Sequence, residues 1–335
     1  MNFWLELVLK LVLILGLVVL PGALVVIFGE LKISAHMQSR IGPYFAGGRW
    51  GWAQPLADGA KFIQKEDLIP AAADDSVYRL APYVVLAGTF ATFVIIPFGP
   101  DLVAADLDLG VFYLLAISSI TTIGVLMAGW SSGNKYSLIG GLRAGAQLIA
   151  YELPMVLAVV AVAVQAGTLS LSGIVEAQAE MSIFGFDLHL PYLLTGQIVG
   201  FVIFMIAALA ELSRIPFDMP IAESELTMGY LTEYSGLRFT MFFLGEYASM
   251  ISFAAVAATL YLGGYYAPFV PTDALNVLGP IILVSKVAVL CFLMIWFRWT
   301  WPRLREDQLQ SLAWHWLIPL ALVNIVVIAT FKAVL

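Results

Sequence analysis

Eight apolar segments, each about as long as a bilayer is thick, constrain this chain more than any other feature of its sequence. The hydrocarbon core of a membrane is about 30 Å thick, and a helix needs about 20 apolar residues to cross it. Because lipid offers no hydrogen bonds, a segment that crosses it satisfies its backbone as a helix. We therefore predict an all-α, polytopic membrane protein, one membrane domain over residues 1–335, with transmembrane helices near residues 3–29, 79–98, 110–130, 144–166, 191–211, 238–262, 277–297 and 312–332.

The composition excludes a water-soluble enzyme. The chain is 61% hydrophobic and 12% charged, whereas soluble domains are about 45–50% apolar and about 25% charged. The first apolar run is too long for a signal peptide and lacks a small-residue cleavage site, so we interpret it as a retained span. A net charge of −7 argues against nucleic acid as a partner.

The loops alternate in charge. Loops 30–78, 131–143, 212–238 and 298–311 hold Lys and Arg, whereas loops 99–109, 167–190 and 263–276 hold none and carry acidic residues instead. Basic loops stay on the inner side of a membrane. The alternation predicts eight spans with both termini on the outer side.

Two inside loops are too long to be simple connectors. In loop 30–78, the stretch 50–67 has the spacing of an amphipathic helix, with one face made of Trp52, Leu56, Ala60 and Ile63. Loop 212–238 mixes acids with aromatic residues and prolines, so we expect it to fold back toward the membrane or under another protein.

Nothing in the sequence predicts a cofactor bound by this chain. An iron–sulfur cluster needs about four thiolates, and the chain has one cysteine, Cys291. The three histidines, His36, His189 and His315, lie in distant segments. No nucleotide-binding glycine motif is present. We predict no metal ligands and no catalytic residues that act in this chain alone.

Several charged residues fall within or at the ends of the predicted spans. Glu152, Glu246 and Lys286 lie inside spans, and Glu30 and Glu211 end spans on the inner side. Such residues are costly in lipid and usually face a bundle interior or a water path. We expect carboxylates to be the partners of Lys286. The acids are material for a proton path, or else interfacial caps and structural partners; the classes left open are a transporter, a channel and a subunit of an energy-coupling complex.

The inside loops resemble one family. Arg214-Ile215-Pro216-Phe217-Asp218-Met219-Pro220 and the acidic stretch that follows it are similar to the membrane H subunit (subunit 1) of proton-pumping NADH:quinone oxidoreductase, respiratory complex I. The resemblance continues, in chain order and over nearly the whole length, at residues 38–43, 54–61, 65–67, 134–143, 151–154, 222–236, 242–247 and 298–303.

The resemblance implies a part in quinone chemistry and proton transfer. Such a subunit forms the membrane side of a quinone-binding chamber, with loops 30–78 and 212–238 at the quinone site. Its quinone-side residues would be Glu30, Arg40, Arg214, Phe217 and Asp218. Its proton conduit would consist of Glu152, Glu211, Asp218, Glu223, Glu225, Glu233 and Glu246.

The resemblance also implies partners and a location. Quinone is the expected substrate, and FMN and iron–sulfur clusters are expected in partner subunits. The partners would be the other subunits of the membrane arm, the quinone-site subunits of the peripheral arm, and membrane lipid. The expected location is an energy-coupling membrane: the bacterial plasma (inner) membrane, with an organellar membrane as the alternative.

Three positions depart from the family's pattern: Leu31, Ile221 and Leu231 stand where an Arg, a Glu and a His are usual. Two other functions stay open. One is the matching subunit of a membrane-bound hydrogenase or ferredoxin-dependent complex. The other is a stand-alone ion transporter, although such folds often contain inverted repeats, which this sequence does not show.

Overall fold

The computed structural model describes residues 8–10, 12–100, 102–180, 190–267, 270 and 274–334. Its described residues form helices and connecting turns, without strands. The helices are α2 (Leu20–Met37), α3 (Gln54–Gln64), α4 (Asp75–Thr92), α5 (Gly110–Ser131), α6 (Lys135–Ala166), α7 (Leu171–Ala179), α8 (Ile198–Glu211), α9 (Glu223–Leu226), α10 (Gly236–Tyr261), α11 (Leu275–Thr300), α12 (Glu306–Ser311) and α13 (Ile318–Val334).

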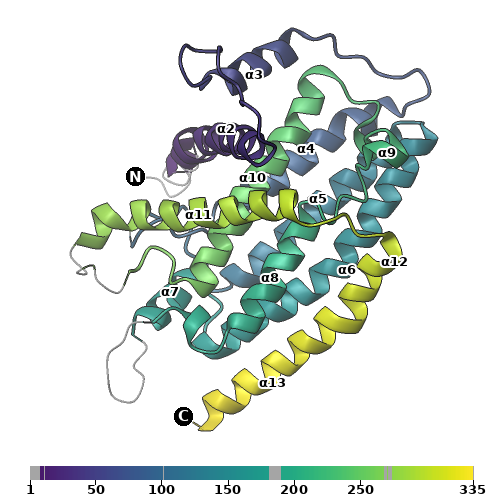
Figure 1. Ribbon diagram of the computed structural model, residues 1–335. Helices are drawn as coiled ribbons and strands as arrows, with labels where there is room; N and C mark the ends of the chain where they lie inside the picture. Colours follow the sequence, from purple (N-terminus) through teal and green to yellow (C-terminus); the bar gives the residue numbers. More distant parts are fainter. Residues whose placement is uncertain are drawn as a thin grey trace.

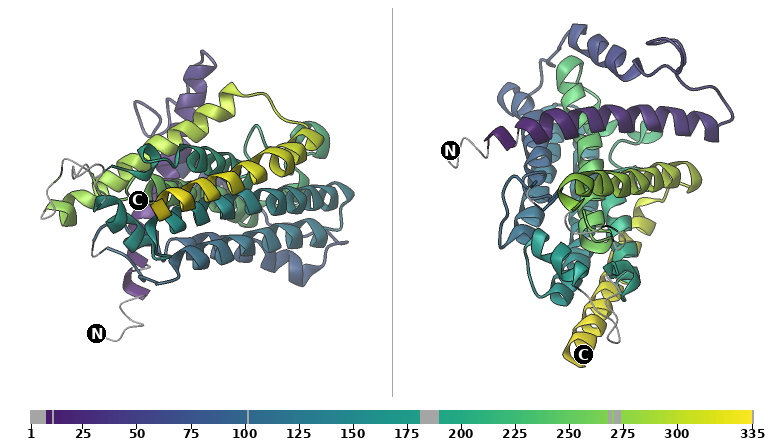
Figure 2. Two further views of the ribbon diagram at one scale, coloured as in Figure 1. Left: turned by 90° about the horizontal axis from the view of Figure 1, so that it is seen from below. Right: turned by 90° about the vertical axis from the view of Figure 1, so that its left-hand side faces the viewer.

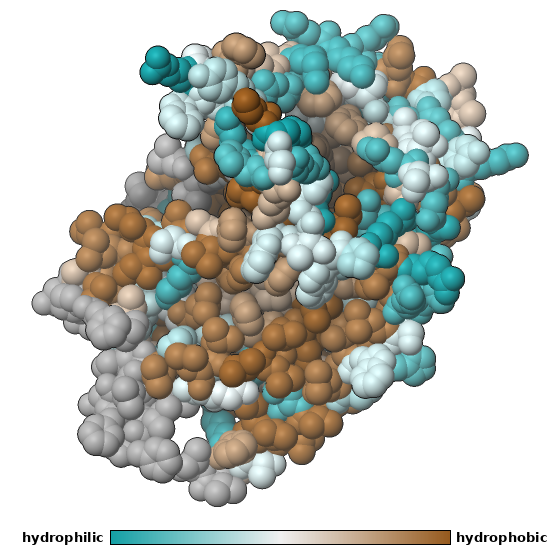
Figure 3. All heavy atoms as spheres, viewed as in Figure 1, coloured by the Kyte–Doolittle hydropathy of each residue, from teal (hydrophilic) through white to brown (hydrophobic). Residues whose placement is uncertain are grey.

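Helices α4, α5, α6, α8 and α10 run side by side, and α2 and α11 lie across this bundle (Figures 1 and 2). Helices α3, α9 and α12, which lie within three of the predicted basic loops, gather at one end (Figure 1). Helix α7 and the C-terminus lie at the other end (Figure 1). Hydrophilic side chains cluster at the α3–α9–α12 end, and hydrophobic ones cover the lower part of the same face (Figure 3). We call the end with α3, α9 and α12 the inner end, and the end with α7 and the C-terminus the outer end.

Six helical runs of the described chain are long and apolar enough to cross a membrane: Val8–Met37, Gly110–Ser131, Lys135–Ala166, Gly236–Tyr261, Leu275–Thr300 and Glu306–Ala333. Ile198–Glu211 is apolar but shorter; at about 1.5 Å per residue it falls short of a bilayer. Helix α4 begins with polar residues and is not among the helices that are long and apolar enough to cross a membrane. The all-helical, multi-pass architecture is confirmed, and the count of eight stays a prediction.

Helix α6 is longer than the span predicted at 144–166. Its 32 residues begin at Lys135, where the Asn134 side chain caps it by accepting the Tyr136 N–H at 2.8 Å. At about 1.5 Å per residue this helix exceeds the bilayer core by several turns. Its first turns, at the inner end, lie outside the predicted span and meet the segment that joins α8 to α10.

That segment, residues 212–235, folds back onto the helices of this same chain. Phe217, Met219, Leu226 and Tyr234 are all buried. The rings of Tyr78 and Tyr234 stack at 4.1 Å, which ties the segment to α4. Leu231 belongs to the apolar cluster that includes Tyr78 and Tyr234, and Ile221 packs against it. At these two departures from the family's pattern, a buried His or Glu would need a polar partner.

The prediction that Lys286 pairs with a carboxylate is wrong. Its Nζ donates to the carbonyl oxygens of Leu262, Gly264 and Tyr266 at 2.6–2.8 Å. These carbonyls follow the C-terminus of α10, where backbone acceptors lack helical donors. Lys286 therefore satisfies the end of a helix, a role that depends on how the chain turns after α10.

We predict that Gly140→Ala destabilises the protein. A Cβ at Gly140 would lie 2.6 Å from Gly229 Cα and 2.7 Å from Tyr230 N, both backbone atoms that cannot rotate away. Overpacking of this kind costs about 1–3 kcal/mol, so the melting temperature of the purified protein falls. Gly29→Ala is the control, because a Cβ at Gly29 meets no described atom within 4 Å. Equal melting temperatures for the two variants would contradict the close contact.

Candidate functional site

A buried arginine organises the inner end of the bundle. The side chain of Arg214 is 1% exposed, and its two terminal nitrogens pair with different carboxylates. Nη1 lies 2.8 Å from Glu30 Oε2 on α2, and Nη2 lies 3.0 Å from Glu246 Oε1 on α10. Because a guanidinium presents several donors in a rigid plane, one arginine can join two acids from different helices. Arg214 therefore links α2, α10 and the turn after α8.

Two further side chains complete this ionic cluster. Arg298, in the last turn of α11, pairs with the second oxygen of Glu30. The guanidinium of Arg214 lies over the ring of Tyr247 at 4.7 Å, a cation–π contact. Two arginines and two carboxylates thus balance their charges at the place where α2, α10 and α11 meet, which limits the cost of burying them.

The turn that carries Arg214 is held by a buried glutamine. Gln147 on α6 donates from Nε2 to the carbonyl oxygens of Ala210, at 2.7 Å, and Phe217, at 2.8 Å. These two carbonyls lie on either side of Arg214 in the chain. Buried carbonyls need donors, and Gln147 supplies them from a neighbouring helix, so α6 fixes the path of the turn.

Asp218 follows this turn with an oxygen that is buried and has no partner among the described residues, Oδ1. Burial raises the pKa of Asp218 to about 6, although the guanidinium groups of Arg303 and Arg298 lower it. A carboxyl group in this range exchanges protons near neutral pH. The structure therefore places a titrating acid beside the ionic cluster.

A small, partly open cavity is lined by two of the predicted acids. It has about 60 Å³ of water-accessible space. Its polar lining consists of Glu211, Glu246 and Tyr230 with hydroxyls of α4, α5 and α10, and apolar side chains form the rest. Those hydroxyls belong to Thr89, Thr121 and Ser249. A water needs about 10–15 Å³ of such space and two or more polar partners, so the cavity has the size and lining to hold a few waters.

Glu211 also lies within electrostatic reach of Glu152, and Glu211 Oε2 is a buried atom without a partner in the described chain. Glu152 accepts a hydrogen bond from Ser119 Oγ at 2.5 Å. The structure thus brings Glu246, Glu211 and Glu152 together as a series across α10, α8 and α6.

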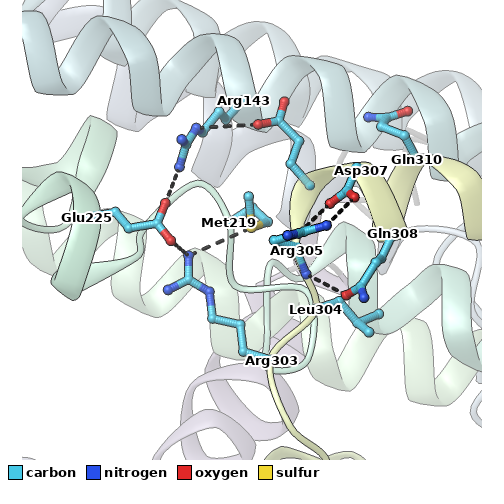
Figure 4. A pocket seen from close by; sticks show the side chains of 10 residues that line it. Arg143, Met219, Glu225, Arg303, Leu304, Arg305, Asp307, Gln308 and Gln310 are labelled. Atoms are coloured by element: carbon cyan, nitrogen blue, oxygen red, sulfur yellow. Dashed lines mark hydrogen bonds and ion pairs between the residues drawn. The ribbon is translucent and has the colours of Figure 1, made fainter.

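The remaining predicted acids are not part of this series. Glu225 is exposed and pairs with Arg143, at 2.7 Å, and Arg303, at 3.3 Å, in an open pocket between α6, α9 and α12 (Figure 4). Glu233 accepts from Asn134 Nδ2 at 2.5 Å, and Glu223 is exposed. Glu233 thus joins the folded-back segment to the N-cap of α6 at Asn134, and Glu225 joins it to Arg143, further along the same helix.

Two predicted quinone-side residues lie apart from each other. Phe217 is buried and packs its ring against Tyr151 at 5.2 Å. Arg40 is exposed and donates to Gln38 at 2.6 Å. Next to Arg40, the side chains of Ile41 and Phe45 are 82% and 90% exposed.

Sequence reasoning missed Arg298, Tyr247 and Tyr230 as parts of the site. By sequence, Arg298 is one of the basic residues of loop 298–311 that mark the inner side, yet it pairs with Glu30. One signal was available, because Glu30 and Arg298 end two predicted spans on the same side and so share a depth in the membrane. No signal in the sequence places the two tyrosines, since their positions follow from how α10 and the folded-back segment pack.

We predict that Arg214→Lys destabilises the protein although it keeps the charge. A lysine ammonium is a point charge that cannot hold Glu30 and Glu246 in the same geometry. Breaking a buried pair costs about 3–5 kcal/mol, which lowers the melting temperature of the purified protein. The control is Arg40→Lys, at an exposed arginine. If both variants melt at the temperature of the unsubstituted protein, the cluster does not hold these helices together.

A family model described as NADH dehydrogenase matches residues 9–329 of the chain. The match covers nearly the whole length, from the helical run that leads into α2 to the last turns of α13. It agrees with the all-helical, multi-pass fold and with the resemblance carried by the inside loops. The chain therefore belongs to the NADH dehydrogenase family, the subunit 1 (H subunit) family of the membrane part of respiratory complex I.

Proposed function

We propose that this chain forms the membrane side of the quinone-binding chamber of a complex I-type NADH:quinone oxidoreductase, and that its buried acids conduct protons during quinone reduction. The observation that carries the proposal is the cavity that Glu246, Glu211 and Tyr230 line together with three hydroxyls. A cavity of this kind inside a bundle of apolar helices is costly unless it is hydrated. Hydrated acids in series can pass protons from one to the next.

The proposed path begins near Asp218 and ends at Glu152. Tyr230 is close enough to both Asp218 and Glu246 to interact with their charges, and burial raises the pKa of its phenol. A neutral phenol both donates and accepts a hydrogen bond, so it can stand between two carboxyl groups. The path then runs through the cavity to Glu211, and from Glu211 to Glu152.

The proposed quinone end lies at the inner surface beside α2. A quinone has a polar head and an apolar tail, so its binding surface needs hydrogen-bond donors next to apolar side chains. The segment after α2 offers Arg40 next to the exposed Ile41 and Phe45. Arg214, Glu30 and Phe217 lie deeper and would act by holding Asp218 and the loop in place.

In this proposal the chain supplies no redox group of its own. Electrons would reach the quinone from FMN and iron–sulfur clusters in partner subunits of the peripheral arm. The contribution of this chain is to bind the quinone at the membrane and to move protons. The acidic residues that pair with arginines at the inner end, such as Glu225, would hold the surface on which the partner subunits sit.

We predict that Glu246→Gln and Glu152→Gln each reduce quinone-linked proton pumping strongly. Glutamine keeps the size of the side chain but cannot gain and lose a proton, so the series is interrupted. Pumping is measured in vesicles that contain the purified complex. The dehydrogenase activity of the complex with an artificial electron acceptor should stay unchanged, because it does not use the membrane part.

Glu176→Gln is the matched control. Glu176 is an exposed acid on α7 at the outer end, away from the series. It should pump at the normal rate. Normal pumping and normal quinone turnover in Glu246→Gln and Glu152→Gln would exclude the proposed path.

We predict that Asp218→Asn slows quinone reduction at least tenfold without reducing the amount of assembled complex. Positioned proton donors contribute about 10²–10⁴-fold to a rate. Because the pKa of Asp218 is about 6, the carboxyl group is largely protonated below this pH and largely ionised above it. The change of rate around pH 6 should disappear in the variant. A normal rate with a normal pH profile would show that Asp218 does not serve the quinone.

A further inference from the structure

A groove at the outer end of the molecule has no part in the function proposed above. It lies between the last turns of α6, the turn before α8 and the C-terminal part of α13, and it has a volume of about 460 Å³. Binding sites for small ligands have about 300–1,000 Å³. The lining residues are Gln165, Thr195, Gly196, Val327, Ile328, Phe331 and Lys332.

The groove has a cation at its polar end. Lys332 is exposed, and its Nζ donates to the Val164 carbonyl oxygen at 2.9 Å. An ammonium has three N–H donors, and one such bond leaves others for a ligand. Lys332 stands out by charge, because the predicted outer loops 99–109, 167–190 and 263–276 contain no Lys or Arg. A cation in such surroundings favours an anionic group.

The same end of the groove offers a buried acceptor. Gln165 donates from Nε2 to Thr195, at 3.3 Å to its Oγ1 and 3.4 Å to its carbonyl oxygen. Its Oε1 is buried and has no donor among the described residues. A buried acceptor without a donor costs about 1–3 kcal/mol. A ligand that carries an N–H or O–H beside its anionic group would remove this cost.

The rest of the groove is apolar. Phe331 is 63% exposed and Val327 is 43% exposed, while Ile328 forms the buried floor. These side chains precede Lys332 on α13, so in the predicted orientation they lie on its side toward the middle of the bilayer. Their surface suits a hydrocarbon chain and extends the groove in the direction that an acyl chain takes from a membrane surface.

We propose that this groove binds one phospholipid of the outer leaflet, with its phosphate at Lys332, a headgroup donor at Gln165 and an acyl chain along Val327 and Phe331. The donor at Gln165 selects headgroups that carry an N–H or O–H, such as phosphatidylethanolamine and phosphatidylglycerol. Phosphatidylcholine has a phosphate and the same acyl chains but no such donor. A helix of a neighbouring subunit would fill the apolar part and leave the polar end unused.

The experiment uses the whole complex, purified in detergent, stripped of loosely held lipid and mixed with each of the three lipids in turn. Quantitative lipid mass spectrometry then counts the lipids retained per complex. We expect Lys332→Met and, independently, the groove-filling Val327→Trp to retain one phosphatidylethanolamine or phosphatidylglycerol fewer than the unsubstituted complex. Phosphatidylcholine should show no such difference.

Lys135→Met is the matched control, since it makes the same chemical change at the inner end of α6, at an exposed lysine. It should retain the full number of lipids. Equal lipid counts in Lys332→Met, Val327→Trp and the control would overturn the proposal. A photoreactive residue at position 331 that crosslinks to another subunit rather than to lipid would also overturn it.

Discussion

A buried arginine is the constraint on which the inner end of this protein depends. Arg214 is almost inaccessible to solvent and is paired with Glu30 and Glu246, which belong to helices far apart in the sequence. A charge buried in an apolar bundle requires compensation, so α2 and α10 must lie where their carboxylates reach the guanidinium. Arg298 pairs with the other carboxylate oxygen of Glu30, and this ion pair joins α11 to α2. The two helices that lie across the bundle are thus attached to it by charge.

The first turns of α6 serve as the platform for the inside segment. They extend beyond the apolar part of the helix, and the backbone of the folded-back segment approaches them closely at Gly140 and Gly229. Gln147, lower on the same helix, holds the turn around Arg214. One long helix therefore positions the ionic cluster, Asp218 and the tyrosine that borders the cavity. Arg214 and Asp218 lie on turns, but a rigid helix fixes where those turns are.

Charge serves two opposite purposes in this chain. At the inner surface, Arg143, Arg303 and Glu225 are at least partly exposed and form an open network of ion pairs. Such pairs contribute little to stability and suit a surface that meets other subunits. In the interior, Glu211 and Asp218 each have a buried oxygen without a partner. Unpartnered buried acids cost stability, and groups of this kind are more common at functional sites than elsewhere in proteins.

Much of the fold was predictable because a membrane leaves clear signals in a sequence. Apolar segments of bilayer length form helices, and basic loops mark the inner side. The lengths of individual helices were less predictable, as α6 and α8 show, because a helix continues or ends according to its caps and its packing. Glu152 and Glu246 were recognisable as unusual because they lie inside apolar segments, where an ionisable side chain is costly.

The sequence by itself determined the all-helical membrane architecture, the family and the set of acids in and beside the apolar segments, because these depend on composition and local order. Only the tertiary structure decided which charges meet. It gave Lys286 a helix end instead of a carboxylate, paired Arg298 with Glu30, and separated Glu225 and Glu233 from the series of Glu246, Glu211 and Glu152. Pairing is a matter of distance between helices, and distance between helices is set by side chains that pack from all parts of the chain at once.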